Sequence, residues 1–118
     1  MKKISFKIPL DVNGRWSLNQ IYSGIHWTKR KTMAEEIHTL TILGLRKSKV
    51  RKEVFNMPVN IIIKYNSRLD IDNHGWLSKM ITDGMKGYLI KDDTKKYVKS
   101  LKQEFYDEEG ILVEVYAN

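Results

Sequence analysis

Two aspartates lie two positions apart in the segment SRLDIDN, at residues 67–73. They are Asp70 and Asp72, and they follow the apolar run VNIIIKY. Residues two apart in a strand point to the same face, so a strand that ends near Asp70 would bring the carboxylates together. Oxygen ligands of this kind are typical of sites that hold Mg²⁺. The pair therefore predicts metal chemistry, with a surface turn as the alternative for Asp70 and a helix N-cap as the alternative for Asp72.

A second acidic pair, Asp92 and Asp93, follows about twenty residues later in the segment IKDD. A helix that leads away from Asp72 and a loop that returns would place this pair beside the first one. Converging carboxylates repel one another unless a divalent cation occupies the site. A single nearby imidazole, His74, among several carboxylates favours Mg²⁺ or Mn²⁺ over zinc. For the later pair, the alternative is a turn with a helix or strand cap.

Lys79, Asp83 and Asn73 lie near the first pair and could either stabilise the helix or assist the metal site. Lys79 and Asp83 are four residues apart on a predicted helix and would form a surface ion pair. Alternatively, Lys79 faces the metal site and neutralises a phosphate or a leaving oxyanion, because it lies about 10 Å along the helix from Asp72. Asn73 is a second candidate for the helix cap, and its use there would leave Asp72 free to bind metal.

The charge of the chain is unevenly distributed. The net charge is +7, and residues 1–52 hold 12 Lys and Arg against 3 Asp and Glu. This basic half, which includes Lys29, Arg30 and Lys31, predicts an anionic partner such as nucleic acid, with a solubilising surface as the alternative. Three aromatic side chains, Tyr22, His26 and Trp27, precede the basic run at residues 29–31. They would stack on exposed bases or pin the loop to the core.

The hydrophobic pattern predicts the elements that position these residues. Strands are expected at 4–8, 59–65, 96–106 and 111–116, helices at 30–46 and 73–86, and a long loop at 10–28. The capping-box spacing of TMAE (32–35) would start the first helix later, and Gly87 would end the second. The last two strands resemble an antiparallel hairpin joined by DEEG. The prediction is a single α+β domain over 1–118, in β-α-β-α-β-β order, with helices packed on a mixed, mainly antiparallel sheet.

The composition is that of an ordinary globular protein. The 118 residues are 42% hydrophobic and 30% charged, which excludes a disordered chain. No apolar run approaches the ~20 residues that span a bilayer, so no membrane is expected as a partner. Cysteine is absent, which excludes disulfides and thiolate zinc sites and makes a cytoplasmic location the simplest expectation.

The acidic residues also follow the pattern of a known family. RLDIDNHGWLSKMITDGM, followed by YLIKDDTKKYVKSL, resembles the RusA-type Holliday junction resolvases, which are small endodeoxyribonucleases common in phages and prophages. That pattern is Asp-x-Asp-Asn, then a helix with a Lys and an Asp, then an Asp-Asp pair before a strand. The matching residues are Asp70, Asp72, Asn73, Lys79, Asp83, Asp92 and Asp93. The opening LNQIYSGIHWTKRK is also similar to that of the family, whereas Lys79 lies further from Asn73 than in the best-known member.

The resemblance implies a homodimer that binds four-way DNA junctions and nicks two strands symmetrically with Mg²⁺, for which Mn²⁺ can substitute. It implies Asp70, Asp72 and Asp93 as catalytic metal ligands, with Lys79 as a further catalytic residue and Asp92, Asp83 and Asn73 as secondary candidates. The candidate DNA contacts are Lys29, Arg30, Lys31, Arg68, Tyr22 and Trp27. Other open interpretations are a non-catalytic nucleic-acid-binding module, a metal-dependent nuclease that acts on other branched DNA or RNA, and a purely structural acidic cluster.

Overall fold

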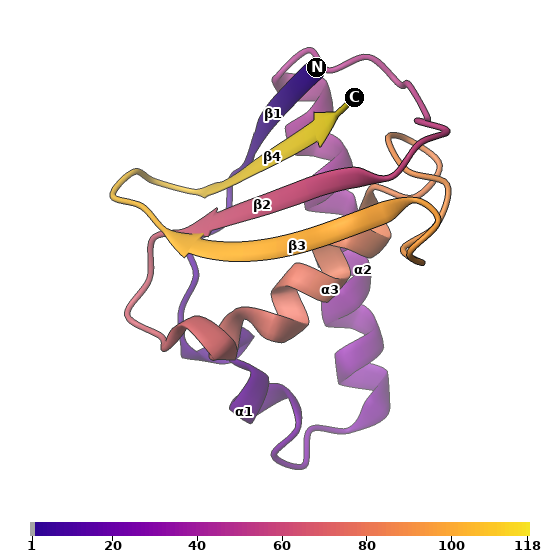
Figure 1. Ribbon diagram of the computed structural model, residues 1–118. Coiled ribbons are helices and arrows are strands. Elements are labelled where there is room, and N and C mark those ends of the chain that lie inside the picture. The colour runs from indigo at the N-terminus through magenta and orange to yellow at the C-terminus, as the bar shows by residue number, and fades with distance from the viewer. Residues whose placement is uncertain (1) are drawn as a thin grey trace.

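Four strands form one mixed sheet in the computed structural model, which describes residues 2–118 (Figure 1). They are β1 (Lys2–Ile8), β2 (Val59–Tyr65), β3 (Val98–Phe105) and β4 (Ile111–Ala117). Their order across the sheet is β1-β4-β2-β3, with β4 antiparallel to both of its neighbours and β3 parallel to β2. The predicted α+β class, element order and mainly antiparallel sheet are therefore confirmed.

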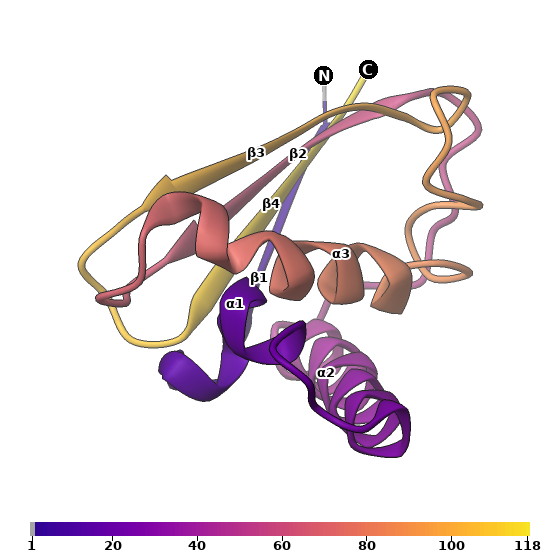
Figure 2. The same ribbon diagram turned by 90° about the horizontal axis from the view of Figure 1, so that it is seen from below.

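The two long helices cover one face of this sheet, as the view from below shows (Figure 2). They are α2 (Trp27–Lys47) and α3 (Gly75–Gly84), while α1 (Leu18–Ile21) and two 3₁₀ turns, η1 (Gly14–Trp16) and η2 (Ile71–His74), lie in the connections. Every second residue of β2 is buried, because successive side chains of a strand point to opposite faces. The apolar stripe of α3, which includes Leu77 and Ile81, packs into the same core.

The connection between β2 and β3 decides where the acidic residues lie. Parallel neighbours need a crossover connection, and α3 provides it. Val59 lies opposite Val98 and Tyr65 lies opposite Phe105, so both strands begin at one end of the sheet and finish at the other. The chain therefore leaves the C-terminal end of β2, passes through η2 and returns along α3 to the opposite end (Figure 1).

The predicted hairpin of the last two strands is wrong, because β4 lies between β1 and β2 rather than beside β3. The sequence of β4, ILVEVYA, is mostly apolar and mostly buried. By contrast, β3 reads VKSLKQEF and is largely exposed. The charged strand occupies the edge, where it costs least to leave side chains and backbone groups in water.

The predicted long loop at 10–28 is also wrong, because η1 and α1 form within it. The side chains of Asn13 and Ser17 cap these turns, accepting backbone N–H bonds at 3.0 and 3.1 Å. Trp16 and Ile21 are buried and anchor the segment to the core. Local caps and two apolar anchors thus order a segment whose composition is typical of a loop.

The first long helix begins earlier than predicted. α2 starts at Trp27, and Nδ1 of His26 accepts the backbone N–H of Thr28 at 3.2 Å. TMAE (32–35) therefore lies inside the helix and does not cap it. The basic residues 29–31 occupy the first turns of α2.

The second long helix is shorter than the predicted 73–86. The 3₁₀ turn η2 precedes it, and it ends at Gly84 with Met85 as the C-cap. Gly87 does not end the helix but adopts a positive φ of 80° in the turn that follows. Its backbone N–H donates to the carbonyl oxygen of Ile90 at 2.8 Å.

Candidate active site

The segment between β2 and α3 carries the first acidic pair, beyond the C-terminal end of β2. Asp70 has an extended backbone (φ −61°, ψ 153°) and directly precedes η2, while Asp72 lies within η2. Both side chains are exposed. The expectation that strand geometry aligns them is wrong, because β2 ends at Tyr65, well before the pair. The 3₁₀ turn, rather than the pleat of a strand, sets the relative directions of the two carboxylates.

Neither aspartate caps a helix through its side chain. Asp70 holds the N-cap position of η2 and His74 that of α3, but within the described residues neither makes a side-chain cap bond. Asn73 instead donates its backbone N–H to the carbonyl oxygen of Asp70 at 3.0 Å. The ion pairs that residues 2–118 form include neither Asp70 nor Asp72. Both carboxylates are therefore available to an external cation.

A buried imidazole holds this segment in place. His74 is fully buried, and its ring stacks on Tyr65 with centroids 4.2 Å apart. Its Nδ1 lies 3.0 Å from the carbonyl oxygen of Ile71 and donates to it, and its Nε2 lies 2.6 Å from the hydroxyl oxygen of Ser67. Since both ring nitrogens are engaged inside the protein, His74 is not available as a metal ligand. It instead joins both ends of the segment that carries the aspartates.

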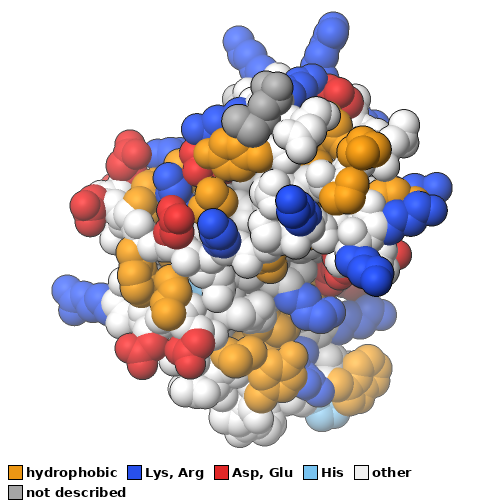
Figure 3. Space-filling model, viewed as in Figure 1, with side chains coloured by type: hydrophobic (Ala, Val, Ile, Leu, Met, Phe, Trp, Pro, Cys, Tyr) orange, Lys and Arg blue, Asp and Glu red, His pale blue; other side chains and the backbone are white. Residues whose placement is uncertain are grey.

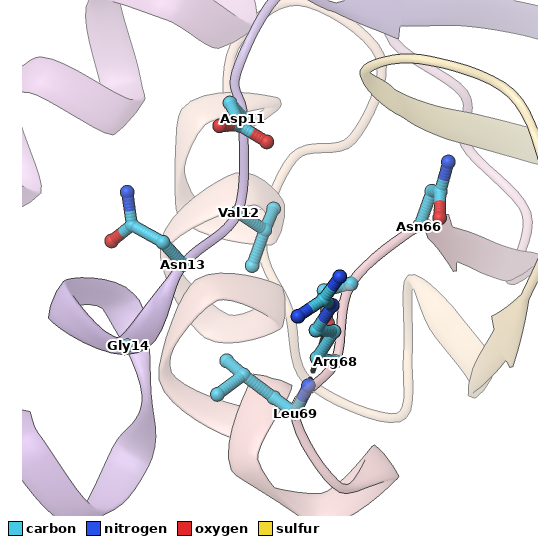
Figure 4. A pocket seen from close by; sticks show the side chains of 8 residues that line it. Asp11, Val12, Asn13, Gly14, Asn66, Arg68 and Leu69 are labelled. Atoms are coloured by element: carbon cyan, nitrogen blue, oxygen red, sulfur yellow. Dashed lines mark hydrogen bonds between the residues drawn. The ribbon is translucent and has the colours of Figure 1, made fainter.

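A pocket of about 430 Å³ opens at the segment that leads into Asp70 (Figure 4). Two segments line it, residues 11–14 and residues 66–69, the second of which runs directly into Asp70. Asn13, Asn66 and the guanidinium of Arg68 lie around this space. Amide groups and a guanidinium are suited to phosphate and sugar oxygens. The role of Arg68 as a phosphate contact stays a prediction.

The basic and aromatic residues lie at the same end of the molecule. α1 packs against both η2 and α3, and the start of α2 follows it (Figure 1). Tyr22 and Trp27 are 60% and 61% exposed, so the alternative that these two rings pin the loop to the core is wrong. The guanidinium of Arg30 lies 5.7 Å from the centroid of the Tyr22 ring, and Lys29 and Lys31 are exposed. Hydrophobic, basic and His side chains gather at this lower end in Figure 3.

The later acidic residues surround a lysine that the sequence analysis did not single out. The Nζ of Lys86 lies 3.1 Å from Asp83, 3.5 Å from Asp93 and 3.6 Å from Asp92. The hydrogen bond with Asp83 raises the pKa of Lys86, and the other two carboxylates add to this effect. The backbone N–H of Asp93 donates to Asp92 at 2.8 Å and lowers the pKa of the Asp92 carboxyl, with a smaller contribution from Lys86. The spacing of three between Asp83 and Lys86 is the signal that would have revealed this contact.

Lys79 forms the predicted ion pair. Its Nζ lies 3.7 Å from Asp83, and its side chain is 64% exposed. A pair so exposed contributes little to stability. The same geometry leaves the lysine free to reorient, so a role for Lys79 toward phosphate stays a prediction.

One chain does not bring the two acidic pairs together. Asp70 and Asp72 lie before α3 and Asp92 and Asp93 lie after it, and ten helical residues span about 15 Å. Across residues 2–118, no three His, Asp or Glu side chains lie close enough to hold a metal ion. The expected return of Asp92 and Asp93 to the first pair does not occur within a single chain. The roles of these residues as metal ligands stay predictions.

Sequence comparison assigns the chain to no family. No protein-family model matches it, and neither does any curated protein. Among the helices of residues 2–118, none combines the length and the apolar character needed to cross a membrane.

Proposed function

We propose that this protein is a magnesium-dependent, structure-selective endodeoxyribonuclease that acts as a homodimer and resolves four-way DNA junctions in recombination and repair. The observation that carries the proposal is the exposed Asp70 and Asp72 pair, held by the buried His74 beside a basic and aromatic surface. A carboxylate pair on a positive surface is unusual for a general anion-binding protein. It is what metal-assisted cleavage of a polyanion requires.

Asp70 and Asp72 fit Mg²⁺ because both supply hard oxygen ligands and neither forms an ion pair within residues 2–118. Mg²⁺ retains several waters and is commonly held by one or two carboxylates, so the pair alone is sufficient for an initial site. When bound, the cation would activate water and stabilise the charge that develops on the phosphate. Arg68 would orient the phosphate, and Lys29, Arg30 and Lys31 would hold the flanking backbone. Tyr22 and Trp27 would stack on bases that a junction leaves unstacked.

In the proposed homodimer, Asp93 of one copy is assigned to the site of its partner. This assignment follows from the separation of about 15 Å that α3 imposes within one chain. It explains how Asp70, Asp72 and Asp93 can act together although no single chain joins them. Two sites related by a twofold axis also suit a junction, whose cleaved strands are related in the same way.

Cleavage of synthetic DNA tests the proposal. A mobile four-way junction, a matched duplex and a fork are each incubated with and without Mg²⁺, with Mn²⁺ in a parallel series. Paired nicks confined to the junction are expected, and Asp70→Asn should reduce them by at least ~100-fold because it removes an anionic ligand. Glu109→Gln is the matched control, because this exposed carboxylate lies in the connection between β3 and β4. Tight junction binding without cleavage under any metal condition would overturn the enzymatic proposal.

Mixed dimers test the assignment of Asp93. Asp70→Asn and Asp93→Asn are each expected to be inactive alone. If each site is shared between copies, a mixed dimer of the two variants has one doubly altered site and one intact site, so nicking of one strand returns. If each site belongs to a single chain, every site in the mixed dimer is damaged and no cleavage returns.

A non-catalytic nucleic-acid-binding role is the second candidate. The observation that favours it is the lack of a three-residue metal cluster within residues 2–118. In that role the wild-type protein would bind the junction tightly and cut it at no concentration of Mg²⁺ or Mn²⁺. A nuclease that acts on other branched DNA or on RNA would retain the Asp70 dependence but prefer the fork or an RNA substrate.

A further inference from the structure

The outer edge of β3 is open. β3 pairs with β2 on one side, and no other strand in residues 2–118 pairs with its second side. The strand is eight residues long, Val98–Phe105, and lies along the lower margin of the sheet in Figure 1. A long edge of this kind presents a row of backbone donors and acceptors that favours pairing with another strand.

The side chains of β3 differ between its two faces. Leu101 and Phe105 register with Ile61 and Tyr65, so they point to the helix-covered side, yet they are 42% and 53% exposed. Residues Lys102 and Glu104 alternate with them and point to the open face. The edge therefore offers two apolar side chains on one face and two opposite charges on the other.

We infer that β3 is the contact surface between two copies of this chain, paired antiparallel about a twofold axis that passes through Gln103. This inference rests on the homodimer of the proposed function and specifies its interface. A twofold axis normal to the sheet keeps the helices of both copies on the same side of the joined sheet. Each β3 residue must therefore lie opposite a residue of the second copy whose side chain points to that same side. The two four-stranded sheets then become one continuous sheet.

In this register the side chains of β3 are self-complementary. Leu101 faces Phe105 of the second copy, which covers the two exposed apolar residues together. Lys102 faces Glu104 of the second copy on the other side of the sheet, and the symmetry repeats both pairs. Opposed apolar and oppositely charged cross-strand pairs each stabilise an antiparallel ladder. The present partner of Glu104 is Lys64 at 4.0 Å, which is distant enough to allow a second contact.

The neighbouring registers lack this complementarity. A shift that centres the axis on Lys102 or on Glu104 sets two like charges against each other. A shift that centres it on Leu101 pairs Glu104 with Val98 and Lys102 with Ser100, so neither charge faces an opposite charge. Of these four registers, only the one centred on Gln103 satisfies both faces of the strand.

The same arrangement bears on the acidic residues. Antiparallel pairing sets the N-terminal end of one β3 alongside the C-terminal end of the other. Asp93 precedes the N-terminal end of β3, and Asp70 follows the C-terminal end of the parallel strand β2. The pairing therefore turns the side that carries Asp93 in one copy toward the side that carries Asp70 in its partner.

Single-cysteine variants test the register, because the natural chain has no cysteine. Directly opposed residues of an antiparallel pair have Cα atoms about 4.5–5.5 Å apart, within the range of a disulfide. We expect Gln103→Cys to form a disulfide-linked dimer under mild oxidation at least tenfold faster than Leu101→Cys, Lys102→Cys or Glu104→Cys. Fastest crosslinking at any of the other three positions would overturn the register.

Charge exchange provides a second measurement that does not depend on the cysteine variants. Lys102→Glu and Glu104→Lys should each weaken self-association at least tenfold in sedimentation equilibrium. The double variant with both changes should recover most of it, because the opposed pair is restored with its signs exchanged. Lys47→Glu/Glu35→Lys, which exchanges two exposed charges on α2, serves as the control. A wild-type chain that remains monomeric at tens of micromolar would overturn the inference.

These outcomes separate the interface from the enzymatic proposal. A β3-linked dimer without nuclease activity would reject the proposed function and retain the interface. A dimeric nuclease whose association ignores the β3 charge changes would reject the interface and retain the function.

Discussion

The hydroxyl oxygen of Ser67 and the Nε2 of His74 lie 2.6 Å apart and close the segment that carries Asp70 and Asp72. The Nδ1 of the ring donates to the carbonyl oxygen of Ile71 at 3.0 Å, so in the neutral ring Nε2 is the acceptor and the Ser67 hydroxyl donates to it. The same hydroxyl oxygen also accepts the backbone N–H of Leu69 at 3.2 Å. An exposed acidic segment is thus held from beneath by a buried hydrogen-bonded ring.

His74→Phe tests this support. Phenylalanine can retain the stacking on Tyr65 but loses both hydrogen bonds, so we expect the free energy of unfolding to fall by about 1–3 kcal/mol. Ser67→Ala removes one of the bonds and should cost less, about 1 kcal/mol. Urea unfolding measures both changes, and Mg²⁺ titration should show weaker binding in both variants. Unchanged stability and metal affinity in His74→Phe would contradict the role.

The contact between α2 and β1 predicts a stability effect far from the site. A Cβ atom at Gly44 would lie 2.4 Å from the carbonyl oxygen of Lys7, which is backbone and cannot rotate away. We therefore expect Gly44→Ala to destabilise the protein by at least about 1–3 kcal/mol in thermal or urea unfolding. Gly14→Ala is the control, because no atom lies within 4 Å of its new Cβ. Equal stability of the two variants would mean that α2 lies farther from β1.

The outer face of the sheet predicts a pH dependence. Burial alone would raise the pKa of Glu114, but Lys3 at 2.9 Å and Lys64 at 3.2 Å outweigh it, so the pKa is lowered. The stabilisation is therefore complete above the ordinary pKa of about 4.5 and is lost as pH falls through the lower, folded-state pKa. Urea unfolding between pH 7 and pH 2 should show a shallower acid loss in Glu114→Gln. The same acid profile in variant and wild type would contradict this assignment.

Lys86 predicts a local effect at the other end of α3. Lys86→Met leaves Asp83, Asp92 and Asp93 without their shared cation, so we expect faster proteolysis of the connection between α3 and β3 at pH 7. The change in global stability should remain below about 1 kcal/mol, because the lysine is partly exposed. Lys95→Met, an exposed change in the same connection, should have no such effect. Equal cleavage rates in the two variants would show that Lys86 does not order this segment.

The basic start of α2 predicts a salt effect on DNA binding. If Lys29 and Lys31 contact phosphates, replacing both with Gln should reduce the slope of log K against log salt by nearly two. Lys47→Gln/Lys49→Gln, at the far end of α2, is the matched control and should leave the slope unchanged. Fluorescence anisotropy with a four-way junction at several salt concentrations measures the slopes. Equal slopes in the two double variants would show that Lys29 and Lys31 do not contact the DNA phosphates.

The sequence by itself determined the fold class, the four strands and the two long helices, although not the exact ends of those helices. The alternation in β2 and the apolar stripe of α3 depend on spacing along the chain, so they were predictable locally. The pairing of Lys79 with Asp83 was predictable for the same reason, because residues four apart on a helix are neighbours wherever the helix lies.

Only the tertiary structure decided which elements adjoin. The placement of β4 between β1 and β2 depends on which strand buries most apolar surface, and adjacent position in the sequence wrongly favoured a hairpin. The same limitation applies to the acidic residues, since the parallel pairing of β2 and β3 sends Asp92 and Asp93 to the far end of α3. His74 is a further example. A histidine can bind a metal, but the burial of this ring and its hydrogen bonds to Ser67 and Ile71 make it a support for the segment that carries Asp70 and Asp72. Spacing defines neighbours within an element, but contacts between elements follow from packing the whole chain.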